Sequence, residues 1–255
     1  MFRFCPLASG SKGNALYLRH HETQILVDAG ISFKALASKL GEIDVDIGEI
    51  EAILVTHEHG DHVRGIEKVA RTLDIPVFAN SETAKAIIKE VRERPRFKIF
   101  STGEPFEYGG IEIHPFSIQH DTLDPVAFTF QMEGIKLGVC ADLGFATTLV
   151  KARLLNCTYL YIEANHEPSM VHACSRPALY KQRVLGRQGH LSNSACAELV
   201  QSIDHEGLKH IYLAHLSEEC NHPDLAIKRV KEQVTREISL SIAHQHRVSD
   251  LIEES

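Results

Sequence analysis

The chain has 255 residues, of which 44% are hydrophobic and 24% charged, and its formal net charge is −7 at pH 7. These values are those of an ordinary globular protein, long enough to bury a sizeable core as one large α/β domain or two small ones. No apolar stretch approaches the ~20 residues that cross a bilayer, and no signal peptide is apparent, so we expect no membrane association. The acidic balance argues against a protein that coats nucleic acid, although a nuclease needs basic residues in one groove only.

Short apolar runs alternate with helical patterns along the chain, which predicts an α/β fold of sheets covered by helices, within a single domain of residues 1–255. Between residues 97 and 140 the pattern changes to consecutive strands joined by Gly-rich turns. In chain order, the strand-like runs are 24–27, 53–55, 76–78, 111–113, 126–130, 135–140, 159–162 and 210–213, and the helical stretches are 63–73, 81–93, 193–204 and 222–236.

Four potential metal ligands lie close together directly after the second strand-like run. The segment reads Thr56-His57-Glu58-His59-Gly60-Asp61-His62. Gly60 disfavours a continuous helix, and in an extended backbone His57 and His59 project to the same side. Asp61 and His62 stand at or just before the start of the next predicted helix. Two ligand pairs can therefore face neighbouring positions, which predicts a site for two metal ions.

Each of these ligands also has a purely structural interpretation. The chain contains 16 histidines, so a single histidine is weak support for a metal site. Asp61 could be only a helix N-cap, and His57 could be a buried histidine with its hydrogen bonds satisfied. Four ligand-type residues at this spacing after a strand favour the metal interpretation.

Five of the apolar runs, among them residues 115–119 before His120, end in an aspartate or a histidine. These residues are Asp28, His57, His120, Asp142 and His215. Functional sites of α/β proteins gather at the carboxyl ends of strands, where loops are free of the packing demands of the sheet. Any one of the five would more simply be a turn former or a surface histidine. Taken together, they are expected to share a site with the cluster at residues 56–62.

The six cysteines are scattered, and no pair has C-x-x-C spacing. This usage predicts free thiols in a reducing compartment, and we expect a cytoplasmic protein.

The residues quoted above resemble the metallo-β-lactamase superfamily, whose signature T-H-x-H-x-D-H is complete at residues 56–62. The resemblance covers nearly the whole chain and implies the αββα four-layer sandwich. It implies that His57, His59 and His120 hold one metal ion, that Asp61, His62 and His215 hold the other, and that Asp142 bridges them. It also implies that Asp28 orients ligands without binding metal. Nitrogen and oxygen ligands suit zinc or manganese, and the absence of a cysteine ligand argues against a true β-lactamase.

Further segments resemble the YycJ/WalJ-type bacterial hydrolases, a family associated with 5′-to-3′ exonuclease activity on DNA. Two departures from the family pattern are Ala141-Asp142-Leu143 in place of the expected Thr-Asp-Thr, and the more acidic segment Glu218-Glu219-Cys220 beside His215. The segments that carry the resemblance are Ala8-Ser9-Gly10-Ser11-Lys12-Gly13-Asn14, Glu163-Ala164-Asn165-His166-Glu167, Gly189-His190-Leu191-Ser192-Asn193 and His215-Leu216-Ser217.

The segments around Glu163 and His190 also resemble paired loops of tRNase Z, another phosphodiesterase of this fold, in which the matching histidine assists the leaving group. By that resemblance, His190 is predicted to protonate the departing 3′-oxygen, and Asp61 to accept a proton from the attacking water. The structural alternative is that residues 189–193 are a polar loop before a helix, with Ser192 or Asn193 as its N-cap.

Basic residues near this loop are candidates for holding phosphates of a substrate. We predict that Lys181 and Arg183, together with Ser192 and Asn193, contact the substrate, and Arg176 and Arg187 are further basic candidates. The alternative for the basic residues is a solvated helix face.

The function predicted from the sequence is a dinuclear metal-dependent phosphodiesterase that acts on nucleic acid, specifically a 5′-to-3′ exonuclease on DNA with two zinc or manganese ions. A small-molecule thioester or lactone hydrolase on the same scaffold is the alternative enzyme. A non-catalytic metal-binding protein is the third class, and the complete ligand set argues against it.

Overall fold

The computed structural model describes residues 1–234 and 236–254. The chain forms two compact units, each built around one seven-stranded sheet. The N-terminal unit comprises Met1–Glu112, Thr122–Val126 and Ala243–Ser255, and the C-terminal unit comprises Ile113–Asp121 and Ala127–Ile242. Among the described residues, no helix is long and apolar enough to cross a membrane.

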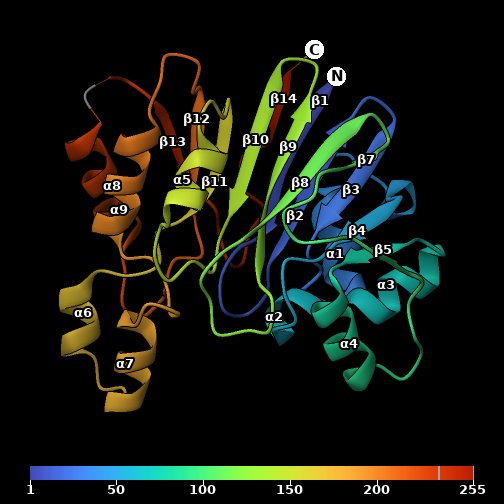
Figure 1. The fold of residues 1–255 in the computed structure, drawn as a ribbon, viewed down its shortest axis with the longest axis horizontal. Helices are drawn as coiled ribbons and strands as arrows, with labels where there is room; N and C mark the ends of the chain where they lie inside the picture. The colour runs from blue at the N-terminus through green and yellow to red at the C-terminus, as the bar shows by residue number, and fades with distance from the viewer. Residues whose placement is uncertain (235, 255) are drawn as a thin grey trace. The chain divides into compact units, whose positions relative to one another are not determined.

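The sheet of the N-terminal unit is mixed. Its strand order is β14-β1-β2-β3-β4-β5-β6, antiparallel from β14 to β3 and parallel from β3 to β6. The C-terminal strand β14 pairs with β1, so both ends of the chain lie in this sheet (Figure 1). The strands are β1 (Phe2–Ala8), β2 (Ala15–His20), β3 (Thr23–Val27), β4 (Ala52–Leu54), β5 (Val77–Ala79), β6 (Phe97–Ile99) and β14 (Ile252–Glu254).

Helices join the parallel strands of this unit, because a parallel pair needs a long crossover connection. Leu36, Ile66, Val69 and Ile87 from these helices pack with the buried strand residues into one hydrophobic cluster. Alternate residues of the same strands, such as Leu18, are also buried, so both faces of the sheet are covered. The helical segments are α1 (Phe33–Gly41), η1 (Ile47–Glu49), α2 (Gly60–Val63), α3 (Ile66–Leu73) and α4 (Ser81–Glu90).

The sheet of the C-terminal unit has the order β13-β12-β11-β10-β9-β8-β7. Strands β10 to β13 are parallel, and β9 is antiparallel to β10. The nearly continuous apolar sequence of the central strands is typical of parallel strands that are buried on both faces. The strands are β7 (Phe106–Tyr108), β8 (Ile111–Ser117), β9 (Val126–Met132), β10 (Ile135–Cys140), β11 (Tyr159–Glu163), β12 (His210–Ala214) and β13 (Ser239–Ile242).

Three helices of the C-terminal unit, namely α5 (Thr148–Leu154), α8 (Asn193–Ile203) and α9 (Pro223–Gln233), pack on this sheet through residues such as Leu154, Val200 and Val230. Figure 1 shows α8 and α9 side by side next to β12 and β13. The helices α6 (Pro168–Ala173) and α7 (Ala178–Leu185) form a separate pair with a small apolar cluster of their own around Val171 and Val184.

The predicted elements are mostly present, with instructive differences. The helix predicted over 63–73 is divided into α2 and α3, because the chain at Gly65 passes against the backbone of Ile31, where an added Cβ would lie 2.2 Å from the Ile31 oxygen. The helix predicted over 222–236 ends at Gln233. The strands β1, β2 and β14 and the helical segments α1, η1, α5, α6 and α7 were not predicted.

Candidate active site

The predicted site residues of the N-terminal unit follow the parallel strands β3 and β4. Asp28 comes directly after β3 and has a positive φ of 61°, a conformation that turns the chain sharply at the strand end. Its buried carboxylate accepts hydrogen bonds from the Thr56 backbone N–H at 2.9 Å and from the Thr56 hydroxyl at 2.8 Å. Asp28 therefore ties the end of β3 to the loop after β4.

Asp28 also determines the tautomer of His62. His62 Nδ1 lies 2.7 Å from Asp28 Oδ2, and a carboxylate only accepts hydrogen bonds, so Nδ1 carries the proton. Nε2 then presents its lone pair. A histidine that donates from one nitrogen to a carboxylate and carries the lone pair on the other nitrogen has the usual arrangement of a metal ligand.

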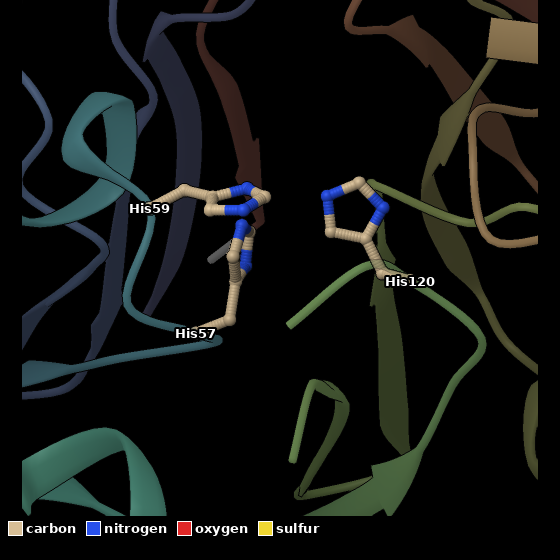
Figure 2. A group of neighbouring side chains, drawn as sticks. All are labelled: His57, His59 and His120. Carbon is tan, nitrogen blue, oxygen red and sulfur yellow. The ribbon is translucent and has the colours of Figure 1, made fainter. Parts of the chain in front are cut away.

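The same logic extends to His57. The Thr56 hydroxyl donates its one proton to Asp28, so it accepts from His57 Nδ1 at 3.0 Å, which leaves the lone pair of His57 on Nε2. The ring of His57 lies 4.8 Å from that of His59, centroid to centroid, in an edge-on arrangement, and 4.0 Å from that of His62. Figure 2 shows the side chains of His57 and His59 on the loop after β4, and it also draws that of His120, on the loop after β8.

Asn14 holds Asp61 and was not predicted as a site residue. Its side chain donates to Asp61 Oδ2 at 3.2 Å and lies 2.9 Å from His62 Nε2, while its backbone N–H donates to the Asp61 carbonyl at 2.7 Å. The buried amide also forms hydrogen bonds in both directions with Gly10. The only sequence signal for Asn14 was its place in the segment 8–14 that resembles the family.

The predicted ligands of the C-terminal unit also follow strand ends. Asp142 comes after β10 and His215 after β12, and both have positive φ, 55° and 54°. His120 follows β8, and its Nδ1 donates to the Gly189 carbonyl at 3.1 Å, so its lone pair is on Nε2. Burial lowers the pKa of His120, which favours the neutral form that binds metals.

Glu163, the last residue of β11, connects these side chains and was missing from the predicted site. It is fully buried and accepts hydrogen bonds from His190 Nδ1 at 2.8 Å and His215 Nδ1 at 3.2 Å. It also accepts from the backbone N–H groups of Leu143 at 2.6 Å and Leu191 at 3.2 Å. Burial alone would raise the pKa of Glu163, but His190 and the side-chain hydrogen bonds outweigh it and lower the pKa to about 2. Glu163 is therefore a buried anion.

Glu163 brings His190 next to the predicted bridging aspartate. Asp142, Glu163, His190 and His215 each offer a ligand-type atom, and these atoms lie within 4.8 Å of one another. His190 is 17% exposed, whereas Glu163 is inaccessible to solvent, so the histidine reaches outward from the buried carboxylate. Its Nδ1 is engaged by Glu163, and Nε2 is the nitrogen left for proton transfer.

The donor set fits divalent transition metals. Four histidines, His57, His62, His120 and His215, have Nδ1 engaged by an oxygen atom of the protein, which directs Nε2 to a ligand. Histidine nitrogen and carboxylate oxygen are ligands that zinc and manganese accept. The cysteines at positions 5, 140, 157, 174, 196 and 220 are free thiols outside this donor set.

The four residues predicted to contact substrate differ in their surroundings. Lys181 donates to the His172 carbonyl at 2.7 Å, and Arg183 forms an ion pair with Asp121 at 2.6 Å. Ser192 is the N-cap of α8 and accepts from the Ala195 N–H, as the structural alternative predicted.

Asn193 is fully buried, and its amide exchanges hydrogen bonds of 2.8 and 2.9 Å with the amide of Asn221. Asn221 in turn donates to the carbonyls of Ala164 and Asn165. Asn193 therefore helps to join the loops that carry Glu163 and His190, and its contact with substrate stays a prediction.

Comparison with known proteins identifies the family. A family model described as "Beta-lactamase superfamily domain" matches residues 23–216. The chain is 35% identical to Exodeoxyribonuclease YycJ of Bacillus anthracis over 250 residues, which cover 97% of this chain and 94% of that protein. It is 34% identical to Exodeoxyribonuclease WalJ of Streptococcus pneumoniae over 239 residues, which cover 92% of this chain and 89% of that protein.

Solved structures share the fold at low sequence identity. The metallo-β-lactamase fold protein YhfI of Bacillus subtilis has a TM-score of 0.74 and 16% identity, over 97% of this chain and 98% of that one. The short form of human tRNase Z has a TM-score of 0.64 and 15% identity, over 96% and 98%. The predicted fold class, an α/β metallo-β-lactamase sandwich, is confirmed, and the protein is a metal-dependent hydrolase. The chain belongs to the metallo-β-lactamase superfamily and, within it, to the family of YycJ and WalJ.

Proposed function

We propose that this protein is a dinuclear metal-dependent phosphodiesterase that degrades DNA as a 5′-to-3′ exonuclease. The observation that carries the proposal is the pair Glu163–His190 beside Asp142, because it adds a held proton donor to a set of metal ligands. The relatives at 34–35% identity are named exodeoxyribonucleases, and the matched segments span most of their length. Both observations favour cleavage of a phosphodiester over other substrates of this fold.

The proposed metal ligands are those that the resemblance implied. His57, His59 and His120 would hold one ion, Asp61, His62 and His215 the other, and Asp142 would lie between them. The ions, zinc or manganese, supply a water of lowered pKa and stabilise negative charge on the phosphate when bound. Asp28 and Glu163 fix the rings of His62 and His215 through their Nδ1 atoms.

Proton transfers in the proposed reaction use two side chains of this chain. Asp61, whose carboxylate is held by Asn14, accepts the proton of the attacking water. His190 donates a proton from Nε2 to the departing 3′-oxygen, and the anionic Glu163 stabilises the imidazolium form that is able to donate. General acid catalysis of this kind contributes about 10²–10⁴-fold to the rate.

The experiment that tests this function is degradation of 5′-labelled single- and double-stranded DNA with Mn²⁺ or Zn²⁺, with Asp61→Ala as the control. We expect metal-dependent release of labelled 5′ nucleotides by the wild-type protein and none by the variant. Intact DNA from protein that carries two metal ions would contradict the proposal. Hydrolysis of S-lactoylglutathione without hydrolysis of bis-p-nitrophenyl phosphate would then indicate a thioester hydrolase. Inactivity on both substrates would indicate a non-catalytic metal-binding protein.

We also propose that the chain works as a single domain, residues 1–255, in the cytoplasm. Five of the six free cysteines are buried and one is partly exposed, which suits a reducing compartment.

A further inference from the structure

A pocket of 380 Å³ lies in the C-terminal unit beside the loop that follows α7. Its walls are Asp121, residues 182 and 183 of α7, and residues 186–189. This volume is at the lower end of the range for small-molecule pockets and is large enough for part of a nucleotide, such as its phosphate group.

The walls of this pocket are joined to the proposed catalytic residues. Asp121 directly follows His120, and Gly189, which directly precedes His190, accepts the hydrogen bond of His120 Nδ1. The backbone of residues 187 and 188 also packs on the loop after Asp142, where a Cβ added to Gly144 would lie 2.1 Å from the Arg187 oxygen. The pocket is therefore held in a definite place relative to the candidate proton donor.

Two guanidinium groups give this pocket its charge. Arg183 is 57% exposed and forms an ion pair with Asp121. Arg187 is exposed and lies over the ring of Phe145, with its Cζ atom 4.2 Å from the ring centroid. Within the described residues no carboxylate pairs with Arg187, so the N–H donors at the edge of its guanidinium are available to a ligand.

The Arg187 guanidinium is held against the ring of Phe145, and Arg183 donates to the Asp121 carboxylate. Two positive groups against one negative group leave a net positive charge in the pocket. A planar guanidinium held in this way matches the oxygen atoms of a phosphate in a bidentate hydrogen bond.

We propose that this pocket is the subsite for the nucleotide phosphate next to the scissile bond, with Arg187 as the principal contact and Arg183 as the second. The inference rests on the proposed function and deepens it, because it assigns the part of the site that would make the enzyme prefer a nucleic acid to a small phosphodiester without neighbouring phosphates. Lys181 has no place in this subsite, since it does not line the pocket and its ammonium group binds the His172 carbonyl.

The test compares two substrates in the wild-type protein and in Arg187→Ala, Arg187→Lys and the matched control Lys231→Ala, which removes an exposed positive charge from α9. A single-stranded oligonucleotide offers a neighbouring phosphate, and bis-p-nitrophenyl phosphate has none. We expect Arg187→Ala to raise KM for the oligonucleotide about 10- to 100-fold. Its kcat/KM on bis-p-nitrophenyl phosphate should fall much less than its kcat/KM on the oligonucleotide, and Arg187→Lys should recover part of the loss. Lys231→Ala should leave hydrolysis of both substrates unaffected.

Salt dependence gives a second measurement on the same proteins. Loss of one phosphate contact to a single strand should reduce the slope of log affinity against log salt by about 0.7 in Arg187→Ala, and Lys231→Ala should leave it unchanged. An unchanged KM for the oligonucleotide in Arg187→Ala would overturn the subsite. An equal loss on both substrates would also overturn it, because Arg187 would then only support the loop that carries Phe145.

If the proposed function itself is wrong, the oligonucleotide assay gives a different result. In that case the wild-type protein would leave the oligonucleotide intact, whatever the variants do. The subsite would still be tested by calorimetric binding of thymidine 5′-monophosphate, which we expect to be about tenfold weaker or more in Arg187→Ala than in the wild-type protein. Equal binding by the two proteins would refute the subsite independently of activity.

Discussion

Asp28 in the N-terminal unit and Glu163 in the C-terminal unit have the same structural role. Each is a buried carboxylate at a strand end that accepts a backbone N–H and holds the Nδ1 atom of a histidine, His62 for Asp28 and His215 for Glu163. Glu163 holds His190 in addition. Removal of a hydrogen-bonded buried carboxylate leaves its partners unsatisfied, so both residues are suitable for substitution experiments.

We expect Glu163→Gln to lower kcat by about 10²-fold or more, because the neutral amide no longer stabilises the protonated His190. The variant should keep most of its metal, since the amide oxygen still accepts from His215. His190→Ala should show a similar loss of kcat, and the double variant should be hardly worse than either single one. Steady-state kinetics with metal analysis checks this, and additive losses would contradict a joint role.

Asp28→Ala should weaken metal binding about 10- to 100-fold, because His62 loses the partner that sets its tautomer. Asp46→Ala removes an exposed aspartate that caps η1 in the same unit and serves as the control. Titration of each protein with Mn²⁺ or Zn²⁺, followed by calorimetry, measures the difference. Equal affinities in the two variants would show that Asp28 does not act on the metal site.

The thiols are expected to differ sharply in reactivity. Burial raises the pKa of Cys5 and Cys157 to about 12 and raises the pKa of Cys140 and Cys196 further. Cys174 is the one cysteine that is partly exposed. Because the thiolate is the reactive form, titration of the native protein with a disulfide reagent at pH 8 should label Cys174 first. Several thiols reacting at once, without denaturant, would contradict the described burial.

At the scale of elements, close backbone contacts position the metal-binding loop. A Cβ added to Gly30, just after β3, would lie 1.5 Å from the Asp61 oxygen, so only glycine lets this turn approach the start of α2. The contact is reinforced by hydrogen bonds from Ala29 to the His62 carbonyl and from Gly65 to the Ala29 carbonyl, 2.8 and 2.7 Å. The loop and helix α2 are thus held to the end of β3 by the main chain itself.

Gly30→Ala should therefore displace Asp61 and destabilise the protein by about 2 kcal/mol or more, a fall in Tm of about 4–8 °C. Gly60→Ala is the matched control, because a Cβ at Gly60 meets no atom within 4 Å. Thermal melts of both variants, with metal titration, test the prediction. A Gly30→Ala protein with wild-type Tm and metal affinity would show that the turn can relax.

At the scale of the whole molecule, the proposal to be tested is that residues 1–255 work as a single domain. If the two units work as a single domain, unfolding of the metal-loaded protein should be one cooperative transition. A chelator should lower Tm and abolish hydrolysis, since metal at 100 times its Kd stabilises the folded state by about 2.7 kcal/mol. Differential scanning calorimetry with and without Mn²⁺ measures this, and two transitions in the loaded protein would refute the single domain.

The resemblance of residues 56–62 to a known signature predicted the superfamily, and local sequence patterns predicted the α/β class and the chemistry of the metal ligands. Four of the proposed ligands lie within residues 57–62, and the others follow apolar strands, so the period of the strands and the residue types carry the information. The ligand roles remain predictions. The fold and family are confirmed.

Tertiary structure alone decided which distant side chains meet. Glu163 reaches His190 and His215 across separations of 27 and 52 residues, and Arg183 reaches Asp121 across 62. The burial of Asn193 against Asn221 could not be predicted from the sequence either. Residue type and spacing predict the local direction in which a side chain points. Contacts between loops depend in addition on the strand order, which brings those loops together at the carboxyl ends of the strands.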